Sequence, residues 1–407
     1  MKHELTWQTG QALARLVAAS KSQYLMRSSL IPVEQRAKFD EVTIKVWTQC
    51  ILDGTTAATN LHAHEQLQLS IGVGGFSAGG IMDRAPAAFM VGTLSAVAEV
   101  HEAAGTRTIE ELRRVHPMMV KDMEDATKEL KDGTGSRAVE GWRTDRPMVL
   151  KGRQKEWVRK LQERRKTRLH QVAGRRQKIA MQAAEKEGGL FLSAPDIEEH
   201  MVANEQLRVS ALRRLGETCH AAGRTCRNLK PNGERCGAAL DGHGHHGATC
   251  ECGGAVVRRH DGLRDLLLKR LATHLGASTH EEQHVREMAQ SAATARLDVG
   301  VTIPGTATNF LDVAIVDSYS DNAGLEFQRQ KQAGAAETME AKKRSKYGPS
   351  TRMVPFVVEA HGRIGPSGMA WINRAYKSEP DLKRALLKEI SAHVQSHTST
   401  MIIASSS

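Results

Sequence analysis

The chain has 407 residues, of which 40% are hydrophobic and 25% charged, a balance typical of globular domains and unlike that of disordered or fibrous proteins. Lysine and arginine number 57 against 46 aspartates and glutamates, and the resulting net charge of +11 favours a polyanionic partner such as nucleic acid. No apolar run reaches the roughly 18 residues of a membrane helix, and "MKHELTWQTG" lacks the apolar core of a signal peptide, so we expect an intracellular protein.

The first part of the chain, residues 1–110, is predicted to be helical. Apolar residues recur at helical spacing in "TGQALARLVAASKSQYLM" and again in "FDEVTIKVWTQCIL". The glycine-rich turn at 72–80 has no Lys-Ser/Thr after it and no suitable strand before it, so it satisfies neither a P-loop nor a dinucleotide motif. We interpret it as a tight connection. Residues 111–208 are predicted to be charged helix without an evident core, and hence a linker or arm.

A strongly basic stretch lies within this arm, over residues 151–178. Between 151 and 180 there are 12 lysines and arginines against 2 glutamates, which accounts for most of the net charge. Such a run is either a solvated helix face or a surface that contacts nucleic acid, and both interpretations stay open. The candidates for phosphate contact are Arg164, Arg165, Lys166, Arg168, Arg175 and Arg176, together with Arg258, Arg259 and His260 farther along the chain.

A Cys/His segment occupies residues 209–258. Five of the six cysteines fall between 219 and 252, beside three closely spaced histidines. In an intracellular protein this pattern indicates a metal site, and three cysteines with one histidine are a common structural zinc set. The best-fitting ligands are Cys226, Cys236, His246 and Cys250, with Cys219, His245 and Cys252 as alternatives. Buried thiols without metal are the competing interpretation.

From residue 259 to 407 the pattern alternates between helix and strand. "RLDVGVTI" and "FLDVAIVD" are β-branched runs separated by a Pro-Gly turn, which predicts neighbouring strands near 297–303 and 310–316. Asp298 and Asp312 hold equivalent places in the two runs. If the strands pair, both carboxylates lie on one edge, where they could share a divalent cation such as Mg²⁺.

A helix is predicted near 333–347, with Lys343 and Tyr347 on one face. Together with Asp298 and Asp312 they could form a site for phosphodiester hydrolysis, in which Mg²⁺ polarises the phosphate and a lysine stabilises charge or activates water. Alternatively, the aspartates end strands and the lysines complement a helix terminus. The terminal "SHTSTMIIASSS" is expected to fray and is given no function.

From about residue 211 to 362 the chain resembles the C-terminal zinc-knuckle and restriction-like endonuclease region of non-LTR retrotransposon reverse transcriptases. The resemblance lies in "CGAALDGHGHHGATC", "RRHDGLRD", "RLD", 13 intervening residues, "LDV" and "KRSKY". More faintly, "QLQLSIGVGGFSAGGIMDRAPAAFMVG" is similar to the helical region that follows the polymerase thumb in such proteins.

The resemblance implies an α/β fold, in which a PD-(D/E)xK-like nuclease domain with a mixed sheet between helices follows a zinc knuckle and a mostly helical N-terminal half. It implies structural Zn²⁺, catalytic Mg²⁺ on Asp298 and Asp312, and a catalytic Lys343 supported by Tyr347. The implied function is nicking of target DNA to prime reverse transcription in the nucleus. DNA is the implied partner, with element RNA as a further candidate.

Two departures from the family pattern affect the catalytic residues. Leu297 replaces a proline before the first aspartate, and Ala314 stands where related nucleases place a lysine, so Lys342, Lys343 or Lys346 would have to reach the site from the helix. The chain also has no Tyr-x-Asp-Asp motif of a polymerase. We therefore expect a truncated element product: either a metal-dependent endonuclease or an inactive zinc-containing nucleic-acid-binding remnant, with a zinc-containing interaction protein as a third alternative.

Overall fold

The computed structural model describes residues 7–52, 55–143, 150, 152–193, 200–220, 223–284, 296–319, 334–347 and 352–406. The chain divides into two compact units. We call Gln11–Cys50 with Leu61–Val172 the helical unit, and Met1–Gly10, Ile51–Asn60 and Ala173–Ser407 the sheet unit. None of the described helices is both long and apolar enough to cross a membrane.

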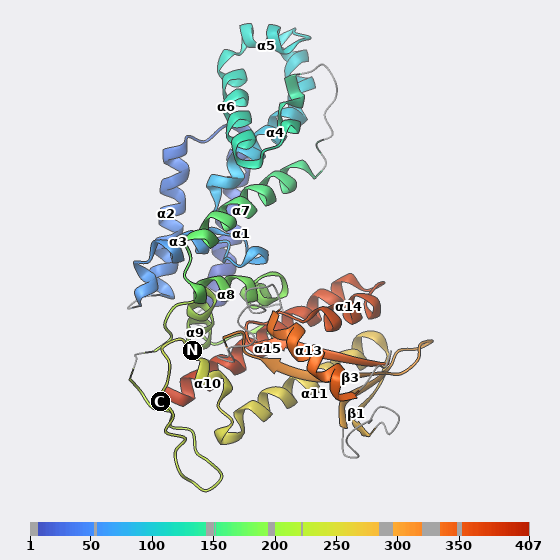
Figure 1. Cartoon of the computed structure of the whole chain (residues 1–407). Coiled ribbons are helices and arrows are strands. Elements are labelled where there is room, and N and C mark those ends of the chain that lie inside the picture. Colours follow the sequence, from blue (N-terminus) through green and yellow to red (C-terminus); the bar gives the residue numbers. More distant parts are fainter. Residues whose placement is uncertain are drawn as a thin grey trace, which may run out of the picture. The chain divides into compact units, whose positions relative to one another are not determined.

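The helical unit is built around three mutually packed helices, α4, α6 and α7 (Figure 1). Their shared core includes Phe89, Met123, Leu130 and Trp157, which are all buried. An ion pair between the buried Arg36 and the half-buried Glu129, at 2.7 Å, joins α2 to α6. The helices that contribute to this unit are α1 (Trp7–Ser28), α2 (Val33–Cys50), α3 (Leu61–Gln68), α4 (Ile81–Ala104), α5 (Ile109–Val115), α6 (Pro117–Thr134) and α7 (Arg153–Val172).

The units do not follow the segments expected from the sequence. Residues 1–110 are helical as predicted where they are described, but 111–172 are not a coreless arm, because α6 and α7 share the core of α4. Their buried residues are separated by many charged ones, which hid the apolar stripe from a composition-based analysis. The glycine-rich connection is tight, as predicted: Gly74, Gly79 and Gly80 all have positive φ.

The sheet unit contains one four-stranded mixed sheet in the order β1-β2-β3-β4. β1 pairs with β2 and β2 with β3 in antiparallel fashion, whereas β3 and β4 are parallel. A parallel pair needs a crossover connection, and here the crossover includes α13. The bounds are β1 (Ser278–His284), β2 (Arg296–Thr302), β3 (Asn309–Val316), α13 (Gly334–Tyr347) and β4 (Met353–Glu359). The strands predicted near 297–303 and 310–316 and the helix predicted near 333–347 are thus confirmed.

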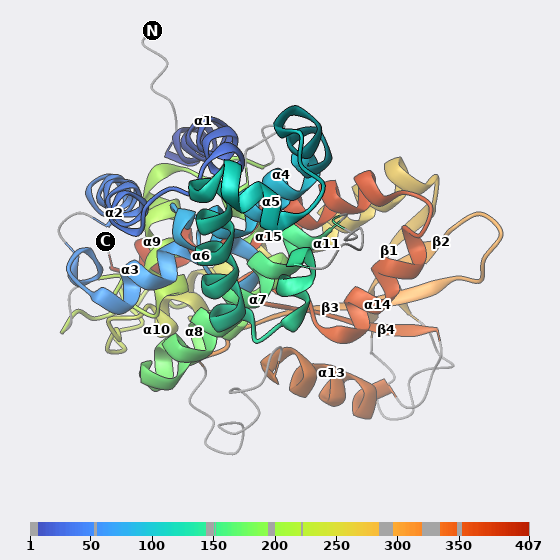
Figure 2. The ribbon, with the colours of Figure 1, turned by 90° about the horizontal axis from the view of Figure 1, so that it is seen from above.

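Helices cover both faces of the sheet. Figure 2 shows α13 and α14 on opposite sides of β3 and β4. One face packs against α11 (Ala255–Leu275), α14 (Pro366–Ala375) and α15 (Pro380–Ser406) through a core that includes Leu267, Leu311, Phe356 and Ile390. On the other face, Ala336 of α13 contacts Val357 of β4. The described fold is therefore helix-rich α/β with a small mixed sheet.

The C-terminal segment is not frayed, which corrects the expectation from its serine-rich sequence. α15 runs to Ser406 and packs against α9 (Asn204–Leu215) and α10 (His245–Thr249). Val209, Ala248 and Ile402 form a buried cluster there. Weak local propensity is overridden because tertiary packing supplies most of the stability of a helix. α8 (Arg175–Ala183) is a further described helix of the sheet unit.

Candidate active site and metal centre

The register of β2 and β3 brings the two predicted aspartates to the same end of the ladder. The pairing runs from Val301 opposite Asn309 to Val299 opposite Leu311, so the next positions in register are Asp298 and Asp312. There the Asp298 side chain replaces a strand-to-strand bond, because its Oδ2 accepts from the amide of Val313 at 2.6 Å. Both carboxylates therefore lie where the two strands cease to pair.

Lys343 of α13 faces the second aspartate. Its Nζ lies 2.6 Å from Asp312 Oδ2 and 3.0 Å from the carbonyl oxygen of Val313. The side chains of Lys343 and Asp312 are only 14% and 7% exposed, so solvent screens this ion pair little. Lys346 instead lies over the ring of Tyr347, at 4.7 Å from the centroid. Lys343 is thus a candidate lysine that bonds directly to a carboxylate of the site.

Tyr347 is buried and holds the end of α13 against β2. Its hydroxyl donates to the carbonyl oxygen of Arg296 at 3.2 Å, and its ring packs with Leu297, Phe310 and Met353. Burial raises the pKa of the phenol, so it stays neutral. The arrangement gives Tyr347 a positioning role for Lys343, one helical turn earlier. Leu297 contributes to this packing.

His260 joins the site from α11, the helix on the opposite face of the sheet. Its Nε2 lies 3.5 Å from Asp298 Oδ2, and its Nδ1 lies 3.2 Å from Asp261 Oδ1. The hydrogen bond to Asp298 raises the pKa of His260 to about 8. The sequence predicts His260 as a phosphate contact. The fold instead brings its side chain to Asp298, a residue of β2.

The two carboxylates have different electrostatic surroundings. Burial raises the pKa of Asp298, but the bonds from His260 and Val313 outweigh burial and lower it overall. Burial also raises the pKa of Asp312, and there the opposing effect of Lys343 is the smaller one, so the pKa stays raised. Two cationic groups thus balance two carboxylates. Carboxylates with divergent pKa values beside a lysine and a histidine are typical of sites that bind a divalent cation or transfer protons.

A buried glutamate that the sequence did not single out positions α13. Glu359, at the end of β4, accepts a hydrogen bond from the amide of Ala336 at 3.3 Å, near the start of α13. Burial raises the pKa of Glu359 to about 7. A carboxyl group at a helix N-terminus satisfies a free amide of the first turn. Glu359 and Tyr347 therefore anchor the two ends of the helix that presents Lys343.

The Cys/His segment forms a compact group of four potential ligands, Cys226, Cys236, His246 and Cys250, which we call the Cys3His cluster. Their ligand atoms all lie within 4.8 Å of one another. The sulfur atoms of Cys226 and Cys250 are 3.7 Å apart, and those of Cys250 and Cys236 are 3.9 Å apart. The Nε2 atom of His246 is 3.5 Å from the sulfur of Cys236.

These separations match a zinc tetrahedron. Bonds of about 2.3 Å to sulfur and 2.0 to 2.1 Å to nitrogen give tetrahedral edges of about 3.8 Å between two sulfurs and about 3.6 Å between sulfur and nitrogen. Without a cation, burial raises the pKa of the Cys226 thiol to about 12, whereas a backbone hydrogen bond at Ala238 lowers that of Cys236. The cluster could hold a metal ion and is compatible with structural zinc. The four best-fitting ligands expected from the sequence are the four that the fold brings together.

The alternative ligands have other environments. Cys219 lies apart from the cluster in an environment whose burial raises its pKa to about 12. Cys252 packs beside the cluster without belonging to the group of four. His245 is directed to Asp317, with its Nδ1 3.0 Å from the carboxylate. Asp241 caps the short α10 by accepting hydrogen bonds from the backbone amides of His243, His245 and His246, and thereby fixes the backbone that carries His246 of the Cys3His cluster.

Asp317 connects the Cys/His segment to the strand of the candidate site. It follows β3 directly, is buried, and accepts from Arg213 of α9 at 3.0 Å as well as contacting His245. The charge of Arg213 and the bond to His245 overcome burial and hold the pKa of Asp317 well below its usual range. β3 thus contains Asp312 of the candidate site. Asp317, five residues later and just after the strand, attaches the end of β3 to α9 and α10 through its ion pairs.

The predicted phosphate contacts are distributed over both units. Arg164 and Arg168 are exposed on α7 of the helical unit, where Arg165 instead pairs with Asp83 at 3.2 Å. Arg175 and Arg176 are exposed on α8 of the sheet unit, as is Arg258 at the start of α11. Lys166 is half-buried.

Arg259 is buried and donates to Thr398 at 2.9 Å. It therefore lacks the exposure that a phosphate contact needs, so the prediction for Arg259 is wrong.

No protein-family model matches the chain, and a search of curated proteins finds no significant match.

Proposed function

We propose that the sheet unit is a metal-dependent DNA endonuclease domain of the PD-(D/E)xK-like kind, stabilised by a structural zinc ion. The observation that carries the proposal is the convergence of Asp298, Asp312, Lys343 and His260 at the point where β2 and β3 separate. Charged groups from two strands and two helices are costly to gather at a partly buried position unless they serve a function.

In the proposed reaction, Asp298 and Asp312 hold Mg²⁺. The ion, when bound, polarises the scissile phosphate and stabilises the charge that develops on it. Lys343, already beside Asp312 at 2.6 Å, is placed to stabilise an additional oxygen of the phosphate or to orient the attacking water. His260 fixes the orientation of Asp298 through its Nε2.

Zinc on the Cys3His cluster fits the structural part of the proposal. The cluster is closed, since four protein ligands leave no open coordination position for chemistry. Through α10, His245 and Asp317 it supports the end of β3. The exposed Arg175, Arg176 and Arg258 would contact DNA phosphates and give affinity with little sequence information.

The biological role that we propose follows the resemblance to non-LTR retrotransposon proteins: nicking of target DNA in the nucleus to prime reverse transcription by a polymerase that lies outside this sequence. A second candidate, an inactive zinc-containing nucleic-acid-binding remnant, is favoured by Ala314, which occupies the strand position of the usual lysine. The bond between Lys343 and Asp312 favours the active enzyme, because it supplies a lysine from α13 instead.

A plasmid-nicking assay distinguishes these candidates. Purified full-length protein is incubated with supercoiled plasmid with and without Mg²⁺, and relaxed circles are quantified for the wild type, Asp298→Asn and Asp312→Asn. Asp381→Asn, an exposed residue in the first turn of α15, is the matched control. Mg²⁺-dependent nicking that survives only in the wild type and the control supports the nuclease. DNA binding without nicking in any of the four supports the remnant.

A further inference from the structure

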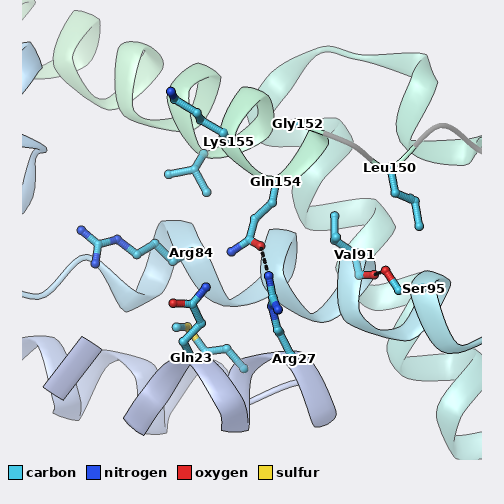
Figure 3. Close-up of a pocket in the computed structure, with 11 residues that line it drawn as sticks. Gln23, Arg27, Arg84, Val91, Ser95, Leu150, Gly152, Gln154 and Lys155 are labelled. Carbon is cyan, nitrogen blue, oxygen red and sulfur yellow. Dashed lines mark hydrogen bonds between the residues drawn. The ribbon is translucent and has the colours of Figure 1, made fainter. Parts of the chain in front are cut away.

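A pocket of about 600 Å³ lies within the helical unit (Figure 3), whereas the residues of the proposed nuclease site belong to the sheet unit. Its lining comes from α1, α4, α7 and the segment just before α7. Arg27, Arg84 and Lys155 line it, and among its described lining residues there is no aspartate or glutamate. A volume of this size suits a small organic ligand, and the excess of cations indicates that the ligand is anionic.

Arg84 has the strongest requirement for an anion. Burial lowers the pKa of its guanidinium, and the charges of Asp40 and Asp83 offset this effect only in part. Both of these are already engaged: Asp40 accepts the amides of Ile81 and Met82, and Asp83 accepts from the helix α7. Among the described residues, Arg84 forms no ion pair with a carboxylate. Its attraction to Asp40 and Asp83 acts over a longer distance. A partly buried guanidinium in this state gains stability when an anion enters the pocket.

Lys155 adds a second cation near the same place. The neighbouring carboxylate of Glu156 is engaged by Arg153 at 2.9 Å and Lys160 at 3.1 Å, and among the described residues Lys155 has no carboxylate partner. In Figure 3, Arg84 and Lys155 lie at one end of the pocket. An anion with several oxygens, such as a phosphate, could bridge the two side chains.

The other end of the pocket is apolar. Val91 and Leu150 lie there in Figure 3, beside Ser95, whose hydroxyl donates to the backbone carbonyl oxygen of Val91 at 2.7 Å. Between the two ends, Arg27 donates to the side-chain oxygen of Gln154 at 3.4 Å. The pocket thus offers cations at one end, hydrogen-bonding groups in the middle and aliphatic carbon at the other end.

We propose that this pocket binds one nucleotide, with its phosphate on Arg84 and Lys155 and its base against Val91 and Leu150. A nucleoside phosphate has the required chemistry, because it combines an anionic end, a polar sugar and a flat base that packs on apolar side chains. The nucleotide could belong to an RNA strand, a DNA strand or a free nucleoside monophosphate. The site would give the helical unit its own grip on nucleic acid, independent of cleavage in the sheet unit.

The test measures the fluorescence anisotropy of labelled six-nucleotide RNA and DNA strands titrated with the full chain. The pocket variant is Arg84→Gln/Lys155→Gln. The control is Lys121→Gln/Lys128→Gln, which removes the same charge from exposed positions on α6 of the same unit. We expect the pocket variant to weaken binding of at least one strand by tenfold or more, and the control variant to weaken it by less than threefold. The pocket side chains would contact the nucleotide directly, whereas the charges of the α6 lysines act at long range and are screened by salt. Equal weakening by both variants, or none by either, would overturn the proposal.

Competition identifies the source of the nucleotide and guards against misfolding. Unlabelled adenosine monophosphate should displace the strand at concentrations at which inorganic phosphate does not. Equal displacement by phosphate would show a simple anion site and overturn the proposal. Whichever of RNA, DNA and the mononucleotide binds most tightly identifies the source of the nucleotide. Lys155→Gln alone, at an exposed position, provides the same comparison if the double variant fails to fold. Nicking activity of the sheet unit is not needed for any of these readouts.

Discussion

Mutations of the ion pair between Lys343 and Asp312 can distinguish a residue kept for stability from one kept for function. The atoms are 2.6 Å apart in a site with little exposure. At an effective dielectric constant of about 20 their gross attraction is about 6 kcal/mol, most of which desolvation offsets. Lys343→Met leaves a buried carboxylate without its cation, so we expect it to reduce the local free energy of unfolding by about 3 kcal/mol.

Asp312→Asn is expected to behave differently. Because the pKa of Asp312 is raised by burial, folding disfavours its ionised form, and the stability that the protonated carboxyl provides is lost as pH rises through its folded pKa. At pH 7 the asparagine variant removes this penalty, while Lys343 keeps its bond to the carbonyl of Val313. We therefore expect Asp312→Asn to change stability by less than about 1 kcal/mol, and the double variant to recover most of the loss caused by Lys343→Met.

The assay is hydrogen–deuterium exchange of peptides that cover β3, at pH 7 in zinc-replete buffer without Mg²⁺, because exchange reports a local free energy in a chain of two units. Asp381→Asn serves as the surface control. Loss of nicking with unchanged protection in Asp312→Asn would identify a carboxylate retained for chemistry. A loss of about 3 kcal/mol in Asp312→Asn, or none in Lys343→Met, would refute the reasoning.

Three further outcomes follow from the structure. Cys250→Ser should lower the bound zinc from about one ion per chain to none, as measured by elemental analysis, and should reduce the protection of β3 peptides from hydrogen exchange. A full zinc complement in this variant would contradict the assigned ligand set. Glu359→Gln should flatten the pH dependence of the stability of β4, measured by exchange between pH 4.5 and 7. The reason is that the raised pKa of the Glu359 carboxyl gives stability at low pH that is lost as pH rises through about 7. An unchanged slope of stability against pH would contradict this. Arg175→Gln/Arg176→Gln should weaken binding to all DNA sequences alike and reduce the salt slope by up to about 2, whereas sequence-selective loss would argue against phosphate contact.

The strands of the site could be predicted because their signal is local. β2 and β3 are β-branched runs around a Pro-Gly turn, and the turn sets the antiparallel neighbourhood that places Asp298 beside Asp312. The members of the Cys3His cluster could be predicted from residue types, because thiolates and imidazoles are the ligands that zinc prefers. Their exact combination depended on a fold that directs His245 to Asp317 instead.

Other features depended on tertiary contacts that leave little trace in a local pattern. β1, "STHEEQH", has no apolar alternation because it is a sheet edge, and it was not predicted. The end of α15 is serine-rich and helical only because Ile402 and its neighbours pack on α9 and α10. His260 reaches Asp298 across the thickness of the sheet, which no spacing in the sequence could indicate.

The measurement that tests the central claim most directly is Mg²⁺-dependent nicking of supercoiled plasmid. The wild type is compared with Asp298→Asn, Asp312→Asn and Lys343→Met, and Asp381→Asn is the control. Hydrogen–deuterium exchange verifies which variants fold as the wild type does. The proposed site predicts relaxed circles for the wild type and control and at least a hundredfold loss for the two aspartate variants. Nicking that persists in Asp298→Asn and Asp312→Asn, or wild-type protein that binds DNA with Mg²⁺ and never nicks it, would contradict the account.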